Sequence, residues 1–492
     1  MMSVHKKVII VGGGITGLAA AYTLQELARK NQSPVSFTLI ESQPRLGGKI
    51  LTDTDHGFVI EGGPDSFISQ KPWALELCLT LGLKDRLTGT NREQTATYIL
   101  QNGRLVALPE GLMLLVPTRF GPLLQTPLFS PLGKLRMGMD WIIPKKRETS
   151  DESLAGFVRR RLGQEAVERL AEPLLAGIYA GDAEQMSLAA TFPQFMELEQ
   201  RHGSLIRGML ARRREMRKRT SSGQGPSPGA VPTTMFMTLK GGLSELVTAL
   251  VSRLDPSALI IGTEVERIHW KAGLSVYHVR LKDGSSITAD AVIAASPAYV
   301  AADLLAETDA TLVRALREIP YVSTATVSLA YRKDQFRHPL NGFGFVVPRR
   351  EGRSIMACTW TSTKFPHRAP EDRVLLRCFV GGAGREDVVS LSDKDIVNRV
   401  RDDLRAIMKI TEEPILSRVY RWEKANPQYP VGHLDRLAGI DDRLTRLPGL
   451  FLAGAAYRGV GVPDCIRQGN EAAERAFKYL TAQKEQRAPG QA

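Results

Sequence analysis

Residues 8–24 read VIIVGGGITGLAAAYTL, which joins a short apolar run, a glycine turn and a run of small apolar residues. This order is typical of a buried strand that opens into a helix through the spacing G-x-G-x-x-G, here Gly12, Gly14 and Gly17. Glycine permits the tight turn, lets a pyrophosphate approach bare backbone and lets the helix pack closely on the strand. The N–H groups at the helix start can then bind phosphate.

A second apolar run, Ser36–Ile40, predicts the next strand, and it ends at Glu41. An acid about 20 residues beyond the glycines is where a ribose hydroxyl needs an acceptor. The sequence therefore predicts a dinucleotide site; the alternative is an ordinary α/β turn with a surface glutamate. The residues expected at the nucleotide are Gly12, Gly13, Gly14, Ile15, Thr16, Gly17, Glu41 and Ser42.

The chain has 492 residues, enough for two or three domains, and a formal net charge of +13. That charge favours anionic partners: polycarboxylates, acidic lipid headgroups or nucleic acid. Of these, we expect no nucleic-acid partner. Much of the charge lies in RRREMRKR, residues 212–219, which runs into a stretch rich in Ser, Gly and Pro. We predict a solvated, flexible basic linker over residues 211–231. Contact with an anionic membrane or substrate is the alternative.

The four cysteines and eight histidines are dispersed, which indicates neither a disulfide framework nor a metal site. A reducing cytoplasm is the expected compartment, and neither a signal peptide nor a transmembrane helix is expected. Residues 111–132 are apolar but interrupted by four prolines. We expect them to form core or the wall of a ligand channel; the alternative is a surface that dips into a membrane.

A second glycine pair follows the expected acid, in PRLGGK at residues 44–49. A glycine turn, an acid and then R-x-G-G resembles the flavin amine oxidase superfamily, which implies FAD rather than a nicotinamide. We expect Arg45 and Lys49 to face phosphates or the flavin, with Gly48 close to the cofactor. In that superfamily the segment matching EGGPDS, residues 61–66, passes beside the flavin ring, which implies contacts from Gly62, Gly63, Pro64 and Asp65.

The C-terminal segment is expected to complete the cofactor site. Residues 449–454 predict a strand, and GVGVPD at residues 459–464 leads into a helix whose positive end would face the flavin's carbonyl edge. Ala455 stands where many FAD proteins carry an acid, which leaves one contact to the cofactor's sugar chain unaccounted for. The remaining residues expected at FAD are Gly454, Val460, Gly461 and Val462, together with Val265 and Trp422.

Residues 236–297 return to a nucleotide-domain pattern after a long, mostly helical excursion, so the domains must be interleaved. The predicted fold class is α/β plus α+β: a Rossmann-type FAD-binding domain, a substrate domain with a mixed sheet and a mainly helical domain. We assign 1–75, 232–298 and 412–492 to the first, and 76–96, 180–210 and 299–411 to the second. Residues 97–179 form the helical domain, with membrane association an open alternative.

Over nearly its whole length the chain resembles the oxygen-dependent protoporphyrinogen and coproporphyrinogen oxidases of haem synthesis. The segments that carry this resemblance include IYAGD (178–182), LKGGLSELV (239–247), FPHRAPED (365–372) and GVGVPDCIRQG (459–469). It is most similar to the soluble Gram-positive branch, which acts on coproporphyrinogen III. The resemblance implies a six-electron oxidation that uses three dioxygen and releases three hydrogen peroxide, with non-covalent FAD as hydride acceptor and no catalytic side chain.

The resemblance also implies substrate contacts from Lys71, Gly177 and Phe343, with Lys71 as an anchor for a propionate. The alternatives are that Lys71 is a solvated lysine at a helix start, that Gly177 only permits tight packing, and that Phe343 belongs to the ordinary core. Protoporphyrinogen IX, with two propionates instead of four, is the nearest rival substrate. A flavin amine oxidase and a non-catalytic flavin-bearing scaffold are more distant alternatives. Transient contact with the next haem-pathway enzyme stays open.

Overall fold

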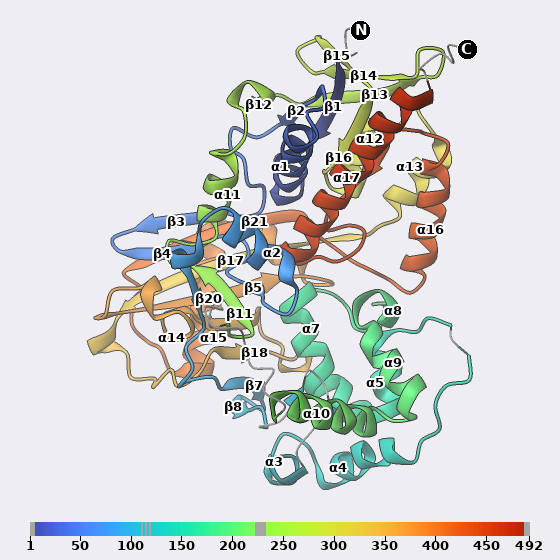
Figure 1. The fold of residues 1–492 in the computed structure, drawn as a ribbon. Helices are drawn as coiled ribbons and strands as arrows, with labels where there is room; N and C mark the ends of the chain where they lie inside the picture. Colours follow the sequence, from blue (N-terminus) through green and yellow to red (C-terminus); the bar gives the residue numbers. More distant parts are fainter. Residues whose placement is uncertain are drawn as a thin grey trace.

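The computed structural model describes residues 5–109, 112–113, 116–117, 120–148, 150–221 and 233–486. Three parts are visible in Figure 1: a parallel sheet with its helices at the top, a second large sheet below it, and a group of helices at the lower right. None of the helices in these described ranges is long and apolar enough to cross a membrane.

The first strand of the chain lies at the centre of a five-stranded parallel sheet. The order is β12 (Leu259–Ile261), β2 (Val35–Glu41), β1 (Lys6–Val11), β16 (Ala291–Ala294) and β22 (Leu450–Leu452). Segments from the beginning, middle and end of the chain thus share one sheet. Strand order reverses at β1, and ligands of such sheets bind beyond the carboxyl ends of the strands at this point.

Both faces of the parallel sheet are covered, which explains why β1 is apolar at successive positions. Val8 and Ile10 pack toward one side, while Ile9 and Val11 pack toward the other. The first side is covered by α1 (Ile15–Lys30), α2 (Pro72–Thr80), α11 (Ser244–Val251) and α17 (Val462–Gln486). The other carries the meander β13 (Val265–Lys271), β14 (Val276–Leu281) and β15 (Ser286–Ala289), with α12 (Ala298–Leu304), α13 (Ala310–Arg317) and α16 (His433–Leu444).

The second large sheet has seven strands and is antiparallel except where β18 pairs with β7. Its order is β21 (Leu416–Pro427), β17 (Tyr321–Arg332), β20 (Arg373–Gly381), β19 (Ile355–Trp360), β18 (Gly344–Val346), β7 (Thr97–Gln101) and β8 (Arg104–Ala107). Asn102 and Gly103 both have positive φ in the β7–β8 turn, as a two-residue hairpin turn requires. Helix α15 (Asp393–Met408) packs on one face.

Short elements connect the two large sheets. Strands β3 (Thr52–Asp55) and β4 (Phe58–Glu61) form a hairpin, and β5 (Phe67–Ile68), β11 (Phe236–Leu239) and β6 (Leu87–Gly89) form a small sheet. Helix α14 (Thr361–Lys364) follows β19 directly. The mixture of a parallel sheet, a largely antiparallel sheet and a helical part confirms the predicted fold class.

The helical part packs on the other face of the seven-stranded sheet, where Ile99, Val346 and Ala357 join its core. A buried ion pair of 2.5 Å joins Arg161 to Asp140 inside it, and both side chains are inaccessible to solvent. Its elements are β9 (Leu112–Met113), β10 (Val116–Pro117), α3 (Phe120–Gln125), α4 (Pro131–Gly138), α5 (Leu154–Leu162), α6 (Gln164–Ala166), a π-helix (Val167–Ala171), α7 (Glu172–Tyr179), α8 (Leu188–Thr191), α9 (Pro193–His202) and α10 (Leu205–Ser221).

The prediction of a basic loop from residue 211 is wrong up to residue 221. Helix α10 continues through the whole run 212–219. Arg, Lys, Met and Glu are strong helix formers, and the next glycine after this run, Gly223, comes only after the helix has ended. Residues 222–231 of the expected linker lie outside the described residues, as does much of the apolar stretch between 110 and 119.

Sheet membership differs from the expected domain boundaries in two places. Residues 97–107, assigned to the helical domain, form β7 and β8 of the seven-stranded sheet. Residues 416–427, assigned to the FAD-binding domain, form its edge strand β21. The division into domains itself stays a prediction.

Candidate functional site

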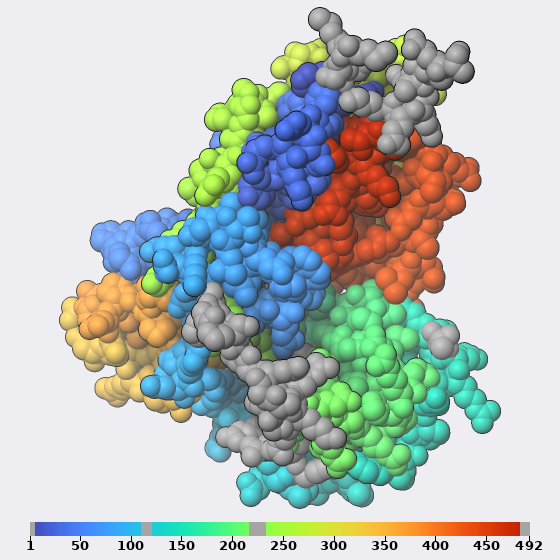
Figure 2. All heavy atoms as spheres, in the orientation of Figure 1, coloured from blue at the N-terminus to red at the C-terminus, as the bar shows by residue number. Residues whose placement is uncertain are grey.

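A cavity of about 3640 Å³ extends from the carboxyl ends of β1 and β2 to helices α7, α9 and α10. The space-filling view in Figure 2 shows the helical part, in teal and green, set below the parallel-sheet part. Pockets for single small ligands rarely exceed about 1,000 Å³. The volume is therefore sufficient for a large cofactor together with a second large ligand.

The glycine turn at the top of this cavity is fixed by packing. Gly12 has a φ of +108°, and a Cβ there would lie 2.9 Å from the carbonyl oxygen of Ala295. A Cβ on Gly17 would lie 1.9 Å from the carbonyl oxygen of Gly12. The Glu41 carboxylate accepts a 2.6 Å hydrogen bond from the Gly13 N–H, so it holds the turn as well as lining the cavity. Its contact with a ribose stays a prediction.

Helix α1 begins at the cavity with unpaired N–H groups. Its N-cap is Gly14, no side chain caps it, and its first turn contains no acidic residue. Gly14, Ile15 and Thr16 line the cavity. The first N–H groups of a helix have no partner within the helix and attract anions. This part of the site fits the pyrophosphate of a dinucleotide.

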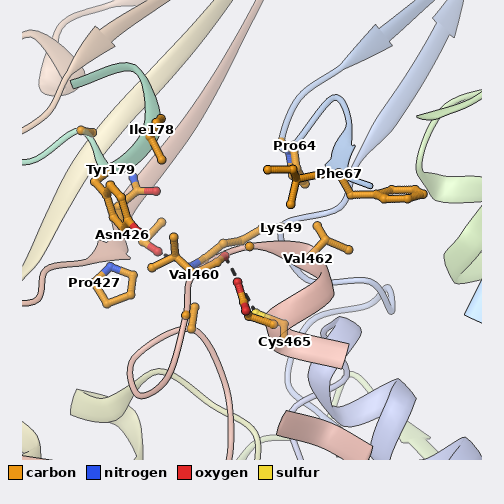
Figure 3. Close-up of a pocket in the computed structure, with 18 of the residues that line it drawn as sticks. Lys49, Pro64, Phe67, Ile178, Tyr179, Asn426, Pro427, Val460, Val462 and Cys465 are labelled. Atoms are coloured by element: carbon orange, nitrogen blue, oxygen red, sulfur yellow. Dashed lines mark hydrogen bonds between the residues drawn. The ribbon is translucent and has the colours of Figure 1, made fainter. Parts of the chain in front are cut away.

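The two basic residues of PRLGGK have different roles. Arg45 donates hydrogen bonds of 2.6 and 3.1 Å to the carbonyls of Gly48 and Ile50 and does not line the cavity, so it shapes the turn. Lys49 lines the cavity and donates to the Ala425 carbonyl. Burial lowers the pKa of the Lys49 ammonium. Figure 3 shows Lys49 between Ile178 and Tyr179 of α7 on one side and Pro64 of the EGGPDS segment on the other.

Three side chains hold the backbone of the EGGPDS segment. The Gly62 carbonyl accepts hydrogen bonds from Trp422 Nε1 at 2.8 Å and from Thr326 Oγ1 at 3.0 Å. Arg377 donates to the carbonyls of Gly62 and Gly63. Because these donors come from β17, β20 and β21, the seven-stranded sheet fixes this part of the cavity wall.

A buried cluster of charges supports the same segment. Lys364 Nζ lies 3.0 Å from Asp65 Oδ2, and Arg368 Nη1 lies 2.9 Å from Glu61 Oε1 with both side chains almost completely buried. Burial raises the pKa of Asp65, but the charges of Lys364 and Arg377 outweigh it and bring the pKa below its usual range. Asp65 is therefore ionised at neutral pH. No group of three or more His, Cys, Asp or Glu side chains in the described ranges could hold a metal ion.

The segment after β22 closes the site at the start of α17. Asp464, in the first turn of this helix, pairs with Lys71 at 2.7 Å. The Tyr429 hydroxyl donates to the Ala455 carbonyl at 2.5 Å and accepts from the Gly459 N–H at 3.0 Å. Ala455, where an acid was expected, is thus part of a backbone clamp. Burial raises the pKa of the Cys465 thiol, which lines the cavity, to about 11.

The lower part of the cavity has an aromatic wall. Gly177 and Phe343 line it, and so do Tyr179, Phe192 and Phe195. The ring of Phe192 lies 6.1 Å from Tyr179 and 5.7 Å from Phe195. In Figure 3, Ile178 and Tyr179 of α7 lie across the opening from Pro64 and Phe67. A flat, apolar ligand could pack against this wall.

The structure brings nearly all residues predicted for the site to one cavity. Those that do not line it are Gly13, Gly17 and Arg45, which act through the turns they build. The three candidate substrate residues Lys71, Gly177 and Phe343 line it. Sequence reasoning missed Lys364, Arg377 and Phe192, and it gave substrate contact by the basic run of α10 only as an alternative. Lys364 directly precedes FPHRAPED, and Phe192 lies in SLAATFPQF (187–195), which is another segment that carries the resemblance. Arg377 sits in a buried strand without any signal.

Comparison with known proteins identifies the class of this fold and site. Residues 15–476 match the family described as flavin containing amine oxidoreductase, so the chain belongs to that family. Membership implies a flavin cofactor.

Similar proteins within this family are porphyrinogen oxidases. Coproporphyrinogen III oxidase of Bacillus subtilis (strain 168) is 42% identical over 476 residues, covering 96% of this chain and 98% of the relative. The chloroplastic protoporphyrinogen oxidase of Oryza sativa subsp. japonica is 32% identical, covering 96% and 88%. A crystal structure from Exiguobacterium sp. 255-15, named provisionally as a protoporphyrinogen oxidase, is 35% identical with a TM-score of 0.84 and covers 97% of this chain and 100% of that chain.

Proposed function

We propose that this chain is an FAD-dependent coproporphyrinogen III oxidase, forming coproporphyrin III in haem biosynthesis. The observation that carries the proposal is a single cavity that joins the uncapped start of α1 to an aromatic wall. The near full-length similarity to a coproporphyrinogen III oxidase supports this substrate over protoporphyrinogen IX. We place the protein in the cytoplasm because of its dispersed cysteines.

The reaction removes six hydrogen atoms from the porphyrinogen, reduces three dioxygen and releases three hydrogen peroxide. FAD, when bound, would supply the hydride acceptor for a methylene bridge and the route of the electrons to dioxygen. The residues of this chain position the cofactor and the substrate. The glycine turns and α1 hold the dinucleotide, and the wall around Phe343 and Tyr179 orients the flat substrate. The start of α17 contributes positive dipole charge to the cavity.

The test is anaerobic mixing of the flavin-loaded protein with three candidate reductants. Coproporphyrinogen III should bleach the flavin absorbance faster than protoporphyrinogen IX, and benzylamine should not bleach it. Faster bleaching by protoporphyrinogen IX would reassign the substrate, and bleaching by the amine alone would make the protein an amine oxidase. Flavin release on denaturation, followed by mass spectrometry, tests non-covalent FAD.

Lys71→Met is expected to raise the KM for coproporphyrinogen III about tenfold while changing kcat little. Lys71 is about half exposed at the cavity wall, so a propionate can approach the ammonium that also pairs with Asp464. Losing one charge-assisted hydrogen bond costs about 1.5–3 kcal/mol. Steady-state oxygen uptake measures both constants.

Asp464→Asn separates the two roles of this lysine. It removes the carboxylate partner but keeps the ammonium, so it should leave the KM unchanged or lower it. An unchanged KM in Lys71→Met would remove Lys71 from the substrate site and leave it as the partner of Asp464.

We also propose weak peripheral contact of α3 and α4 with an anionic membrane. Leu124, Leu132, Leu135 and Ile142 are each more than 60% exposed. The exposed cations Lys145 and Arg147 follow them in sequence. Exposed apolar side chains near basic residues favour binding at the surface of acidic bilayers. Contact with the next haem-pathway enzyme stays a prediction.

Leu135→Glu combined with Ile142→Glu should reduce cosedimentation with phosphatidylglycerol vesicles several-fold and leave oxidase activity in detergent-free buffer unchanged. Each substitution replaces an exposed apolar side chain with a charge that acidic headgroups repel. Phosphatidylcholine vesicles serve as the neutral control. Equal sedimentation of the variant and the wild type would contradict the membrane contact.

A further inference from the structure

Helix geometry decides which arginines of the basic run face the cavity. Residues three and four apart lie on one face of a helix. Met209, Arg212 and Arg213 have this spacing in α10, and all three line the cavity. Met209 is buried, Arg213 is half-buried and Arg212 is exposed. This face of α10 therefore belongs to the core at Met209 and reaches the rim of the cavity at the two arginines.

Another face of α10 points away from the cavity. The guanidinium of Arg207 lies 5.0 Å from the ring centroid of Trp141, outside the cavity. Arg214 is two turns later on the same face, is exposed and does not line the cavity. The neighbouring residues Arg213 and Arg214 thus differ in that only Arg213 lines the cavity.

Most other cations of the cavity wall already have partners. Lys71, Lys282, Lys364 and Arg458 pair with carboxylates. The other two, Lys49 and Arg377, donate to backbone carbonyls, and Arg377 is buried. The side chain of Arg212, in contrast, makes no hydrogen bond or ion pair with any residue in the described part of the chain. A carboxylate that enters the cavity from solvent therefore meets an available guanidinium at this rim.

We propose that Arg212 and Arg213 form a carboxylate subsite at the rim of the substrate cavity. This inference rests on the proposed function and explains how the substrate cavity selects its substrate. Phe195, Leu198 and Met209 line the cavity as well and supply an apolar surface for the ring edge. The guanidinium groups bind propionates that project toward solvent, with the paired geometry that arginine offers to a carboxylate. A substrate with four carboxylates gains more from this subsite than one with two.

The test compares Arg212→Gln and Arg213→Gln with the matched control Arg214→Gln. Each cavity-facing variant should lower kcat/KM for coproporphyrinogen III about tenfold through KM, with less effect on protoporphyrinogen IX. Arg212→Lys should recover part of the loss. Arg214→Gln should match the wild type, and the flavin content of all variants should be equal.

Binding of the product provides a readout that does not depend on turnover. Quenching of coproporphyrin III fluorescence should show weaker binding by Arg212→Gln, and the wild-type affinity should fall with rising salt. Equal constants for Arg212→Gln, Arg213→Gln and Arg214→Gln in both assays would overturn the subsite. A wild type that oxidises neither porphyrinogen would refute the proposed function, and the binding assay would still decide the subsite.

Discussion

Gly14→Ala is expected to lower the affinity for FAD about 100-fold without unfolding the protein. The added Cβ would have no heavy atom closer than 3.9 Å, so the protein alone accommodates it. Gly14 nevertheless lines the cavity at the start of α1, where a pyrophosphate must approach the backbone. A methyl group forced into a close-packed contact costs about 1–3 kcal/mol. Fluorescence titration of the flavin-free protein measures the affinity, and its melting temperature measures the fold.

Gly17→Ala is the contrasting variant. Its Cβ would lie 1.9 Å from the backbone oxygen of Gly12, so the helix must move away from the strand. Both the melting temperature of the flavin-free protein and its FAD affinity should fall. If Gly14→Ala binds FAD as tightly as the wild type, the pyrophosphate does not lie at the start of α1.

The contrast between these glycines shows what the sequence could predict. A turn such as GGGITG is determined by neighbouring residues, so its conformation and the helix after it follow from local rules. The hairpin turn at Asn102-Gly103 was predictable for the same reason. Arg45 shows the limit of such reasoning: its motif was recognised, but hydrogen bonds to nearby carbonyls turn it away from the cavity.

The rest of the site depends on contacts between distant residues. Arg377 lies in an apolar strand and reaches Gly62 and Gly63 only because β20 passes beneath the EGGPDS segment. The basic run was misread because its charge and the Ser, Gly and Pro residues after it suggested a solvated loop. Arg, Lys, Met and Glu also favour a helix, and the helix that they form packs against α9. Which arginines of the basic run face the cavity and which face outward depends on their positions around the helix, and composition alone does not give these positions.

Glu61→Gln is expected to lower the free energy of unfolding by about 3–5 kcal/mol. Glu61 is 1% exposed, and its partner Arg368 is fully buried, so the substitution leaves a buried guanidinium without a counter-charge. The carboxylate also accepts hydrogen bonds from the Leu243 N–H at 2.7 Å and from Thr52 Oγ1 at 2.7 Å. The amide can keep one of these contacts but cannot replace the charge. Urea unfolding of the flavin-free protein, followed by tryptophan fluorescence, measures the loss.

Glu266→Gln is the matched control, because Glu266 pairs with Arg280 on the surface at 2.8 Å with both side chains exposed. Solvent screens that pair, so its loss should cost less than about 1 kcal/mol. The Glu61 variant should also bind FAD more weakly, since Arg368 donates to the Asp65 carbonyl beside the cavity at 3.2 Å. If both variants unfold at the same urea concentration, the buried pair contributes no more than a surface pair. The cavity wall would then owe its position to the donors that hold Gly62 rather than to the charges behind it.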